Sequence, residues 1–281
     1  KYEYATRRLI IHAKKIKSII TSDYVKKIRA SYYLIGALIS RKHQIEMAYP
    51  GGCAFTTRPI DIHLSVFEQQ GVKIDVGETL KFKAKDLKPT IIDFPRVTVG
   101  GTINAILSSV YTKGETILNN VAVEPEVIDV INFIKQMGGD ITFISNQSIS
   151  IKGVKKLHGT TYKIMPDRIE AGTFIVIAAA CAKKMRINNV IPQHLESLLS
   201  KLDEMGVNMH VGIDYVEVEE SKDLKGTDVT TKPYPGFATD LQQPLTVLMT
   251  QAKGESKVED TIYPERFKHC YELTKMGANI E

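Results

Sequence analysis

A unit of about seventy residues recurs along this chain of 281 residues, and the repeat limits the folds that the chain can adopt. Each copy holds a helix pattern that starts with proline and ends at glycine, with isoleucine or methionine three residues later. The copies lie at 59–74, 125–141, 192–209 and 264–280, and their glycines are Gly71, Gly138, Gly206 and Gly277. Proline lacks the amide that would be unpaired at the first helical position, and glycine tolerates a positive φ just past the last one. We therefore expect four amphipathic helices in equivalent positions.

Each unit also holds a second helix pattern that is apolar on nearly all sides. These patterns lie at 30–40, 101–111, 171–182 and 241–252. Short strand patterns follow them at 45–48, 116–119, 186–189 and 257–260, hairpin patterns follow the first three glycines, and the segments that start at Leu87, Leu157 and Leu224 each indicate a strand and then a break. The unit is therefore β-α-β-α-β-β. A helix that is apolar all round must be enclosed by its neighbours, so we expect the units to cluster around these helices.

The composition excludes several classes of protein. No run of 18 apolar residues occurs, so we expect no membrane span. Cys53, Cys181 and Cys270 are far apart and odd in number, which argues against a disulfide framework and for a reducing, cytoplasmic setting; the last two are expected to be packed thiols. The net charge of +5 is spread along the chain, so an ordinary basic surface or a phosphorylated small molecule explains it better than nucleic acid. The histidines lack metal-ligand spacing, and we expect no metal or other cofactor.

One loop is inserted where the other units pass from strand to helix in a few residues. It spans 50–63 and contains two adjacent glycines, Cys53 and Arg58. An insertion in one copy of a repeat is a common place for function, and glycines let a backbone approach a ligand closely. A cysteine near an arginine and a helix start can act as an acid or a nucleophile. Taken alone, however, Cys53 is more simply interpreted as an ordinary loop cysteine.

Short motifs elsewhere occur in the same order as in one known family. They are Arg29-Ala30-Ser31, Val99-Gly100, Glu124-Pro125-Glu126, and the stretches 166–170, 236–240 and 265–267. With the Gly-Gly-Cys loop, they resemble the UDP-N-acetylglucosamine 1-carboxyvinyltransferase family, within the EPSP synthase superfamily, along essentially the whole chain. The resemblance implies an α/β (α+β) fold, an inside-out α/β barrel of repeated βαβαββ units in two domains. It places a nearly complete first domain with the Cys53 loop at 1–164 and part of a second at 165–281, truncated at both ends.

The resemblance also implies an enolpyruvyl (carboxyvinyl) transferase whose substrates are phosphoenolpyruvate and UDP-N-acetylglucosamine. In that reaction, the first committed step of peptidoglycan synthesis, the sugar 3′-hydroxyl adds to C2 of phosphoenolpyruvate, C3 is protonated and phosphate leaves. Cys53 would donate the proton, form the thioether-like adduct and be alkylated by fosfomycin. Asp240 would take the proton from the sugar hydroxyl, although it is also placed to be a helix N-cap.

A set of substrate-binding residues follows from the same resemblance. Arg29 stands at a helix start, where the helix dipole disfavours a cation, and a guanidinium suits phosphate and carboxylate. Arg58 would face phosphoenolpyruvate as well as the nucleotide. The other implied binding residues are Pro59, Ile60, Asp61, Ile62, Arg96, Val97, Thr98, Val99 and Ile262, with Asp167, Arg168 and Arg266 as secondary residues of the cleft. Each also has a plain structural interpretation, as part of a helix start, a turn or edge packing.

Departures from the family pattern leave other interpretations open. Phe55-Thr56 replaces Ile-Gly, Ala238 replaces the usual proline, and Tyr263-Pro264 replaces Phe-Glu. The family's N-terminal Lys-Asn pair and C-terminal phosphoenolpyruvate-binding arginines lie outside this chain, so we expect the polypeptide alone to have little or no turnover. The alternatives are a non-catalytic paralogue that binds a UDP-sugar, and an enolpyruvylshikimate-phosphate synthase, which lacks the Gly-Gly-Cys loop.

Overall fold

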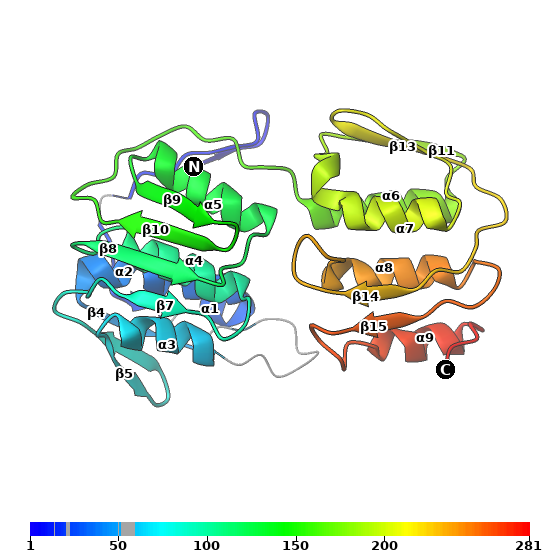
Figure 1. The fold of residues 1–281 in the computed structure, drawn as a ribbon. Coiled ribbons are helices and arrows are strands. Elements are labelled where there is room, and N and C mark those ends of the chain that lie inside the picture. The colour runs from blue at the N-terminus through cyan, green and yellow to red at the C-terminus, as the bar shows by residue number, and fades with distance from the viewer. Residues whose placement is uncertain (14, 21–22, 50, 52–59) are drawn as a thin grey trace.

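The computed structural model describes residues 1–13, 15–20, 23–49, 51 and 60–281, which form two halves lying side by side (Figure 1). The elements of the first half are β1 (Tyr2–Glu3), β2 (Arg8–Leu9), β3 (Ile19–Ile20), α1 (Asp23–Lys27), η1 (Arg29–Tyr32), α2 (Tyr33–Lys42), β4 (Gln44–Met47), α3 (Asp61–Gln69), β5 (Lys73–Val76), β6 (Leu80–Lys83), β7 (Ile91–Asp93), α4 (Val99–Ser109), β8 (Glu115–Asn119), α5 (Pro125–Gln136), β9 (Asp140–Ser145) and β10 (Ser148–Lys152). Those of the second half are α6 (Arg168–Cys181), β11 (Lys184–Asn188), η2 (Pro192–Leu195), α7 (Glu196–Glu204), β12 (Met209–Val211), β13 (Tyr215–Glu219), β14 (Val229–Thr231), α8 (Thr239–Met249), β15 (Val258–Asp260) and α9 (Lys268–Lys275).

The sheet topology confirms the repeat. Both four-stranded sheets of the first half have the same order, β3-β4-β6-β5 and β7-β8-β10-β9. In each, the first pair is parallel and spans a helical crossover, and the other two pairs are antiparallel. The second half repeats parts of this pattern in the antiparallel sheet β11-β13-β12 and the parallel pair β14-β15. The β-α-β-α-β-β unit expected from the sequence is therefore present.

The helix punctuation is confirmed at the glycines and only in part at the prolines. Gly71, Gly138, Gly206 and Gly277 all have positive φ values, between 82° and 98°. Pro125 is the first residue of α5, as predicted, whereas Pro192 begins the 3-10 helix η2. The prediction is wrong for the last copy, because α9 begins at Lys268 and the residues after Pro264 form a turn closed by the amide of Arg266 and the carbonyl of Tyr263 at 2.9 Å.

The strand predicted after Leu157 is absent from the described structure, and this prediction is wrong. Residues 157–167 instead connect the two halves, as Figure 1 shows. Their polar groups bond to α5 and the turn after it: the amide of His158 donates to the carbonyl of Met137 at 2.9 Å, and the Tyr162 hydroxyl donates to Asp129 Oδ1 at 2.8 Å. The equivalent amides of Lys88 and Lys225 also donate to the carbonyls of Gln70 and Met205 at 2.9 Å, but those two segments continue into the strands β7 and β14, whereas residues 157–167 lead to α6.

The apolar helices form two separate cores, one in each half. In the first half α2 packs closely on α4, most of whose residues are buried. In the second half α6 packs on α8, but Phe174, Ile177 and Val247 are about half exposed. The prediction that all these helices are enclosed is therefore wrong for one face of α6 and α8. It is also wrong that Cys181 is packed, because this thiol is exposed at the end of α6, while Cys270 is half-buried.

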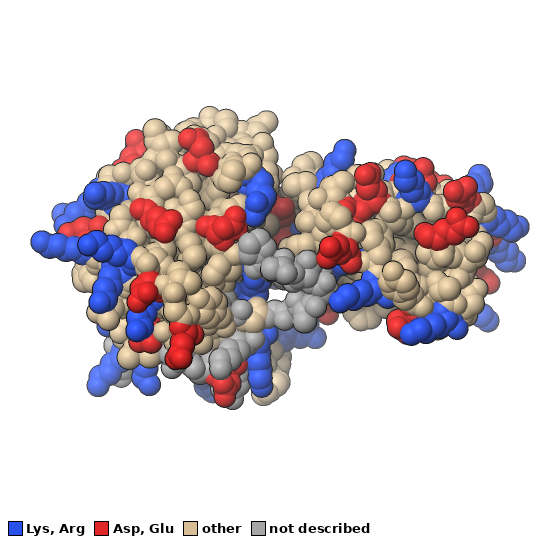
Figure 2. Space-filling model, turned by 90° about the horizontal axis from the view of Figure 1, so that it is seen from below, with Lys and Arg blue, Asp and Glu red and all other residues tan. Residues whose placement is uncertain are grey.

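The surface of the described residues carries mixed charges. On the face seen in Figure 2, Lys and Arg alternate with Asp and Glu over both halves, without a continuous basic stripe. Across the described part of the chain, none of the helices is both long enough and apolar enough to span a bilayer.

Candidate functional site

Three of the residues expected in the site, Cys53, Arg58 and Pro59, lie outside the described residues. The others fall into three groups in space. One lies at the starts of α3 and α4 in the first half, one at the start of α8 in the second half, and one at the junction between the halves. Within the described ranges, no group of three or more His, Cys, Asp or Glu side chains is arranged to hold a metal ion.

The starts of α3 and α4 lie next to each other. Arg96 Nη2 is 3.4 Å from Oδ1 of Asp61, the first residue of α3, and both side chains are exposed. Thr98 is the N-cap of α4, and its hydroxyl accepts from the amide of Gly101 at 3.3 Å. Because the first amides of a helix lack intrahelical acceptors, two adjacent helix starts offer donors to an anion.

A pocket of about 200 Å³ opens beside this pair of helix starts. It lies between α3 and the turn after β7, and Asp61 and the buried Ile62 contribute to its wall. Ile60, Val97 and Val99 are partly buried against the core of the first half. These three side chains therefore also support the fold, and the exposed polar groups of Asp61 and Arg96 are the ones placed to meet a ligand.

Arg29 joins this group through stacked rings. It is the first residue of η1, and its guanidinium carbon is 6.0 Å from the ring centroid of the buried Tyr32. The Tyr32 ring stacks on His63 with the centroids 5.2 Å apart, and His63 Nδ1 is 2.9 Å from Asn104 Nδ2. Sequence reasoning missed His63 and Asn104. A signal for Asn104 was present, because a polar residue in an apolar helix needs a buried partner.

The second group surrounds the start of α8. Asp240 lies in the first turn, but Ala238 occupies the N-cap position, so the interpretation of Asp240 as a helix cap is wrong. Its Oδ1 is 2.6 Å from Arg266 Nη1, which unites a predicted catalytic residue with one expected to be secondary. The Asp240 side chain remains 55% exposed, whereas Arg266 is 19% exposed. The amide of Ile262 donates to Oδ1 of Asp260 at 2.9 Å, and Oδ2 of Asp260 accepts from the hydroxyl of Thr239, the first residue of α8, so this predicted binding residue is also connected to the start of α8.

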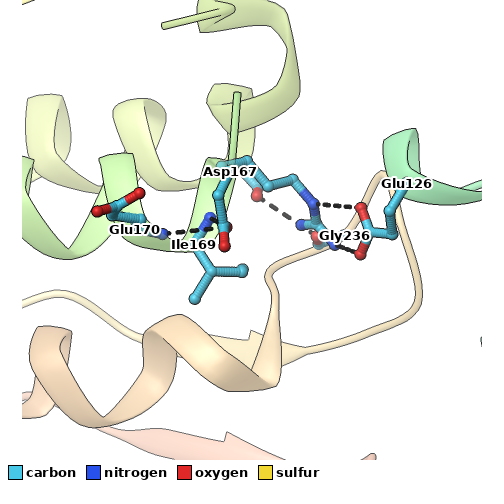
Figure 3. A network of polar contacts seen from close by, with 7 residues as sticks. Glu126, Asp167, Ile169, Glu170 and Gly236 are labelled. Atoms are coloured by element: carbon cyan, nitrogen blue, oxygen red, sulfur yellow. Dashed lines mark hydrogen bonds and ion pairs between the residues drawn. The ribbon is translucent and has the colours of Figure 1, made fainter. Parts of the chain in front are cut away.

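The third group links the two halves. Asp167 caps α6 by accepting from the amides of Ile169 and Glu170 at 2.8 and 3.2 Å (Figure 3). The guanidinium of Arg168, whose side chain is only 9% exposed, forms two hydrogen bonds of 3.1 Å to the Glu126 carboxylate of α5. Its carbon also lies 5.5 Å from the ring centroid of Tyr234. Asp167 and Arg168 thus have structural contacts that account for both charges.

A second pocket, of about 260 Å³, lies at this junction. Its wall includes Asp129, His194 and Tyr234, which come from both halves. Burial, aided by the positive charge of Arg168, lowers the pKa of His194. Burial raises the pKa of Glu124, against the opposing effect of backbone amides and Arg168. The junction therefore holds titratable groups that burial pushes toward their neutral forms.

Comparison with known proteins gives the family. The sequence profile of EPSP synthase (3-phosphoshikimate 1-carboxyvinyltransferase) matches residues 2–281. UDP-N-acetylglucosamine 1-carboxyvinyltransferase 2 of Staphylococcus aureus (strain MRSA252) is 47% identical over 264 residues, which cover 93% of this chain and 63% of that protein. UDP-N-acetylglucosamine 1-carboxyvinyltransferase of Clostridium botulinum (strain ATCC 19397 / Type A) is 47% identical over 266 residues, covering 94% and 64%. The chain therefore spans a little under two thirds of the length of these relatives.

Solved structures agree with this result. The crystal structure of the enolpyruvyl transferase NikO from Streptomyces tendae matches with a TM-score of 0.83 and 26% identity, covering 92% of this chain and 62% of that one. EPSP synthase from Acinetobacter baumannii, with a TM-score of 0.60 and 20% identity over 82% of this chain and 54% of that one, shares the fold. The mixed α/β fold expected from the sequence is confirmed, and this chain belongs to the EPSP synthase family of enolpyruvyl transferases.

Proposed function

We propose that the full-length protein transfers the enolpyruvyl group of phosphoenolpyruvate to the 3′-hydroxyl of UDP-N-acetylglucosamine and releases phosphate. The observation that carries this proposal is the 47% identity, over 93% of the chain, to UDP-N-acetylglucosamine 1-carboxyvinyltransferase 2 of Staphylococcus aureus. We also propose that each half is part of an inside-out α/β barrel and that the domains divide at residues 164 and 165. The two separate apolar cores support this division.

In this proposal the first half binds the anionic substrates. Asp61, Arg96 and the adjacent starts of α3 and α4 meet the nucleotide, and Arg29 supplies a fixed guanidinium for a phosphate or carboxylate group. The ion pair between Arg96 and Asp61 supports this role, since both side chains are exposed and neither is committed to the core. The Cys53 loop and Arg58 complete the phosphoenolpyruvate site, with Cys53 giving the proton to C3.

Asp240 is the proposed base for the sugar hydroxyl. A base must lie within hydrogen-bonding distance of the proton that it removes. The half-exposed carboxylate, with one oxygen held by Arg266, is suited to present its other oxygen to a substrate. The proposal requires the Cys53 thiol, the Arg58 guanidinium and the Asp240 carboxylate to meet around one substrate pair, and a structure with bound UDP-N-acetylglucosamine that keeps them apart would contradict it.

Fosfomycin labelling separates this function from that of a non-catalytic paralogue that binds a UDP-sugar. We expect intact and peptide mass spectrometry to find one adduct, on Cys53, whose formation is faster with UDP-N-acetylglucosamine than without it. The two other thiols are internal controls, because Cys181 is exposed and the pKa of the half-buried Cys270 is raised by burial. Labelling of Cys181 at the same rate would indicate unspecific alkylation, and an unmodified Cys53 beside bound nucleotide would favour the paralogue.

Phosphate release gives the direct assay. The full-length protein should release phosphate only when both substrates are present, and replacing UDP-N-acetylglucosamine with shikimate 3-phosphate should abolish the release. Activity with shikimate 3-phosphate instead would support the enolpyruvylshikimate-phosphate synthase alternative. For the 281-residue chain alone we expect little or no phosphate release, and normal rates would contradict that expectation.

A further inference from the structure

A buried carboxylate organises the start of α8 and the turn that follows β15. Asp260, the last residue of β15, is 4% exposed. Its Oδ1 accepts from the Thr231 hydroxyl at 2.7 Å and from the amides of Ile262 and Tyr263 at 2.9 and 2.8 Å. Its Oδ2 accepts from the Thr239 hydroxyl at 2.6 Å. One side chain thus connects β14, β15, the turn with Ile262 and the first residue of α8.

The direction of the next hydrogen bonds is fixed by chemistry. A guanidinium only donates and a carboxylate only accepts. The Thr239 hydroxyl therefore donates to Asp260 and accepts from Arg266 Nη1, which lies 3.2 Å away. The same Nη1 is 2.6 Å from Asp240 Oδ1. A continuous series of contacts thus runs from the buried carboxylate through a hydroxyl and a guanidinium to the half-exposed carboxylate.

Arg266 has further neighbours that fix the plane of its guanidinium. Its carbon lies 5.9 Å from the ring centroid of Tyr263, the residue whose amide bonds to Asp260. With its side-chain amide turned so that Oε1 faces the guanidinium, Gln243 accepts from Arg266 Nε at 2.7 Å. The guanidinium is held on several sides by groups from α8 and the turn after β15, and the Thr239 hydroxyl connects it to Asp260 through two hydrogen bonds.

We propose that Thr239 and Asp260 are positioning residues, which set the place of the Arg266 guanidinium and through it the orientation of the Asp240 carboxylate. The inference rests on the proposed function, in which Asp240 takes the proton from the sugar hydroxyl. A base works only when it is held close to the productive geometry, so a loosened Arg266 reduces the rate of the chemical step. Substrate affinity depends mainly on other contacts and changes little.

The same carboxylate offers a matched control. The Thr231 hydroxyl also donates to Asp260, and Thr231 is fully buried. Its hydroxyl donates to Oδ1 of Asp260, not to the Oδ2 atom that Thr239 uses, and it accepts from the amide of Thr261. Thr231→Val and Thr239→Val therefore delete the same kind of hydrogen bond to the same acceptor, but only the second removes a contact of Arg266.

The experiment measures kcat and both KM values by phosphate release for the full-length parent, Thr239→Val, Thr239→Ser and Thr231→Val, with thermal unfolding of each. For Thr239→Val we expect kcat to fall about tenfold or more, with each KM changed less than about threefold. Thr239→Ser keeps the hydroxyl and should recover most of the loss. Thr231→Val should lower the melting temperature at least as much while kcat stays near that of the parent.

Two failures can be told apart. If the parent releases phosphate but Thr239→Val keeps its kcat, or Thr231→Val loses as much kcat as Thr239→Val, the positioning inference is wrong and the proposed function stands. If the parent releases no phosphate from the two substrates, the proposed function is wrong, and the inference falls with it. Should Thr239→Val fail to fold, a Thr239→Ser variant with the low kcat expected of the valine variant also overturns the inference.

Discussion

Asn104 shows how a single polar residue can connect several parts of a site. It is fully buried in α4, its side chain contacts His63 at 2.9 Å, and α2 packs directly against it at Gly36. His63 follows the predicted binding residues of α3 and stacks on Tyr32. The His63–Asn104 contact therefore fixes the first turn of α3, where the nucleotide is proposed to bind, against the middle of α4.

A second buried pair joins the same two helices at their other ends, and it allows a controlled test. Gln70 Nε2 donates to Ser109 Oγ at 2.9 Å, and both residues are fully buried. We expect Asn104→Ala and Gln70→Ala each to lower the free energy of unfolding by about 1–3 kcal/mol, because each removes a hydrogen bond between two buried residues and leaves a cavity. Only Asn104→Ala should weaken binding of UDP-N-acetylglucosamine.

Denaturant unfolding and calorimetric titration of the two variants check this prediction. If both variants bind UDP-N-acetylglucosamine as tightly as the parent, the His63–Asn104 pair contributes only to general stability and not to binding. A loss of affinity in Gln70→Ala as large as that in Asn104→Ala would contradict the prediction as well.

At this scale the sequence indicates which residues belong to the candidate site better than it indicates which of them contact one another. The family resemblance indicated Asp61 and Arg96, which are 35 residues apart, and the structure brings them together. It also indicated Asp240 and Arg266, which form an ion pair. It gave no role to Asp260 or to Thr239, because their importance comes from hydrogen bonds across β14, β15 and α8 that no local pattern encodes. Whether these residues bind substrate stays a prediction.

At the scale of elements, local patterns predicted most of the fold. The apolar helix predicted at 101–111 is α4, two residues earlier, and the hairpin predicted at 209–211 and 215–219 is β12 and β13. Periodicity and glycine punctuation act within one element and so are visible in the sequence. The strand after Leu157 and the helix start at Pro264 were predicted wrongly, since both depend on where the neighbouring segment lies in space.

The two pairs of central helices are built alike but differ in how closely their backbones approach. A Cβ atom on Gly36 of α2 would lie 2.7 Å from the backbone carbonyl oxygen of Asn104 in α4. A Cβ on Gly172 of α6 would instead meet the ends of the Leu241 and Leu198 side chains at 2.9 and 3.0 Å. Backbone atoms cannot move without shifting a helix, whereas leucine methyl groups can rotate away.

We therefore expect Gly36→Ala to be the more damaging of the two substitutions. It should lower the free energy of unfolding by about 1–3 kcal/mol through overpacking. Gly172→Ala should cost less, because both variants gain roughly 1 kcal/mol in helix propensity but the strain against mobile leucine side chains is smaller. Urea unfolding of both variants, followed by circular dichroism, gives the comparison, and a larger loss for Gly172→Ala would contradict it.

For the whole molecule, the junction between the halves is the feature that the sequence described least well. Arg168 was expected as a secondary residue of the substrate cleft, and in the structure two of its guanidinium nitrogens, Nε and Nη2, donate to Glu126 across the junction. The repeat pattern is continuous through this region, so nothing local marks residues 157–167 as the connection between two cores. The orientation of one half relative to the other depends on contacts, such as that of Arg168 with Glu126, that form only in the folded molecule.

Two glutamates at this junction, two residues apart, should respond in opposite ways to loss of their charge. Burial raises the pKa of Glu124, a residue that is 8% exposed, so the folded state favours the neutral form of its carboxyl. Its contribution to stability is therefore complete below the ordinary glutamate pKa of about 4.3 and is lost as the pH rises through the raised value. Glu126, by contrast, accepts both hydrogen bonds from Arg168.

Glu124→Gln should consequently be at least as stable as the parent at neutral pH, and its advantage should shrink as the pH falls toward about 4. Glu126→Gln should be less stable than the parent at neutral pH, because the largely buried Arg168 guanidinium loses the charge of its partner. Unfolding free energies of the three proteins between about pH 4 and 8 provide the measurement. The same sign for both variants at neutral pH would mean that the junction does not distinguish the two carboxylates, and the account of Glu124 as a carboxyl held toward its neutral form would be wrong.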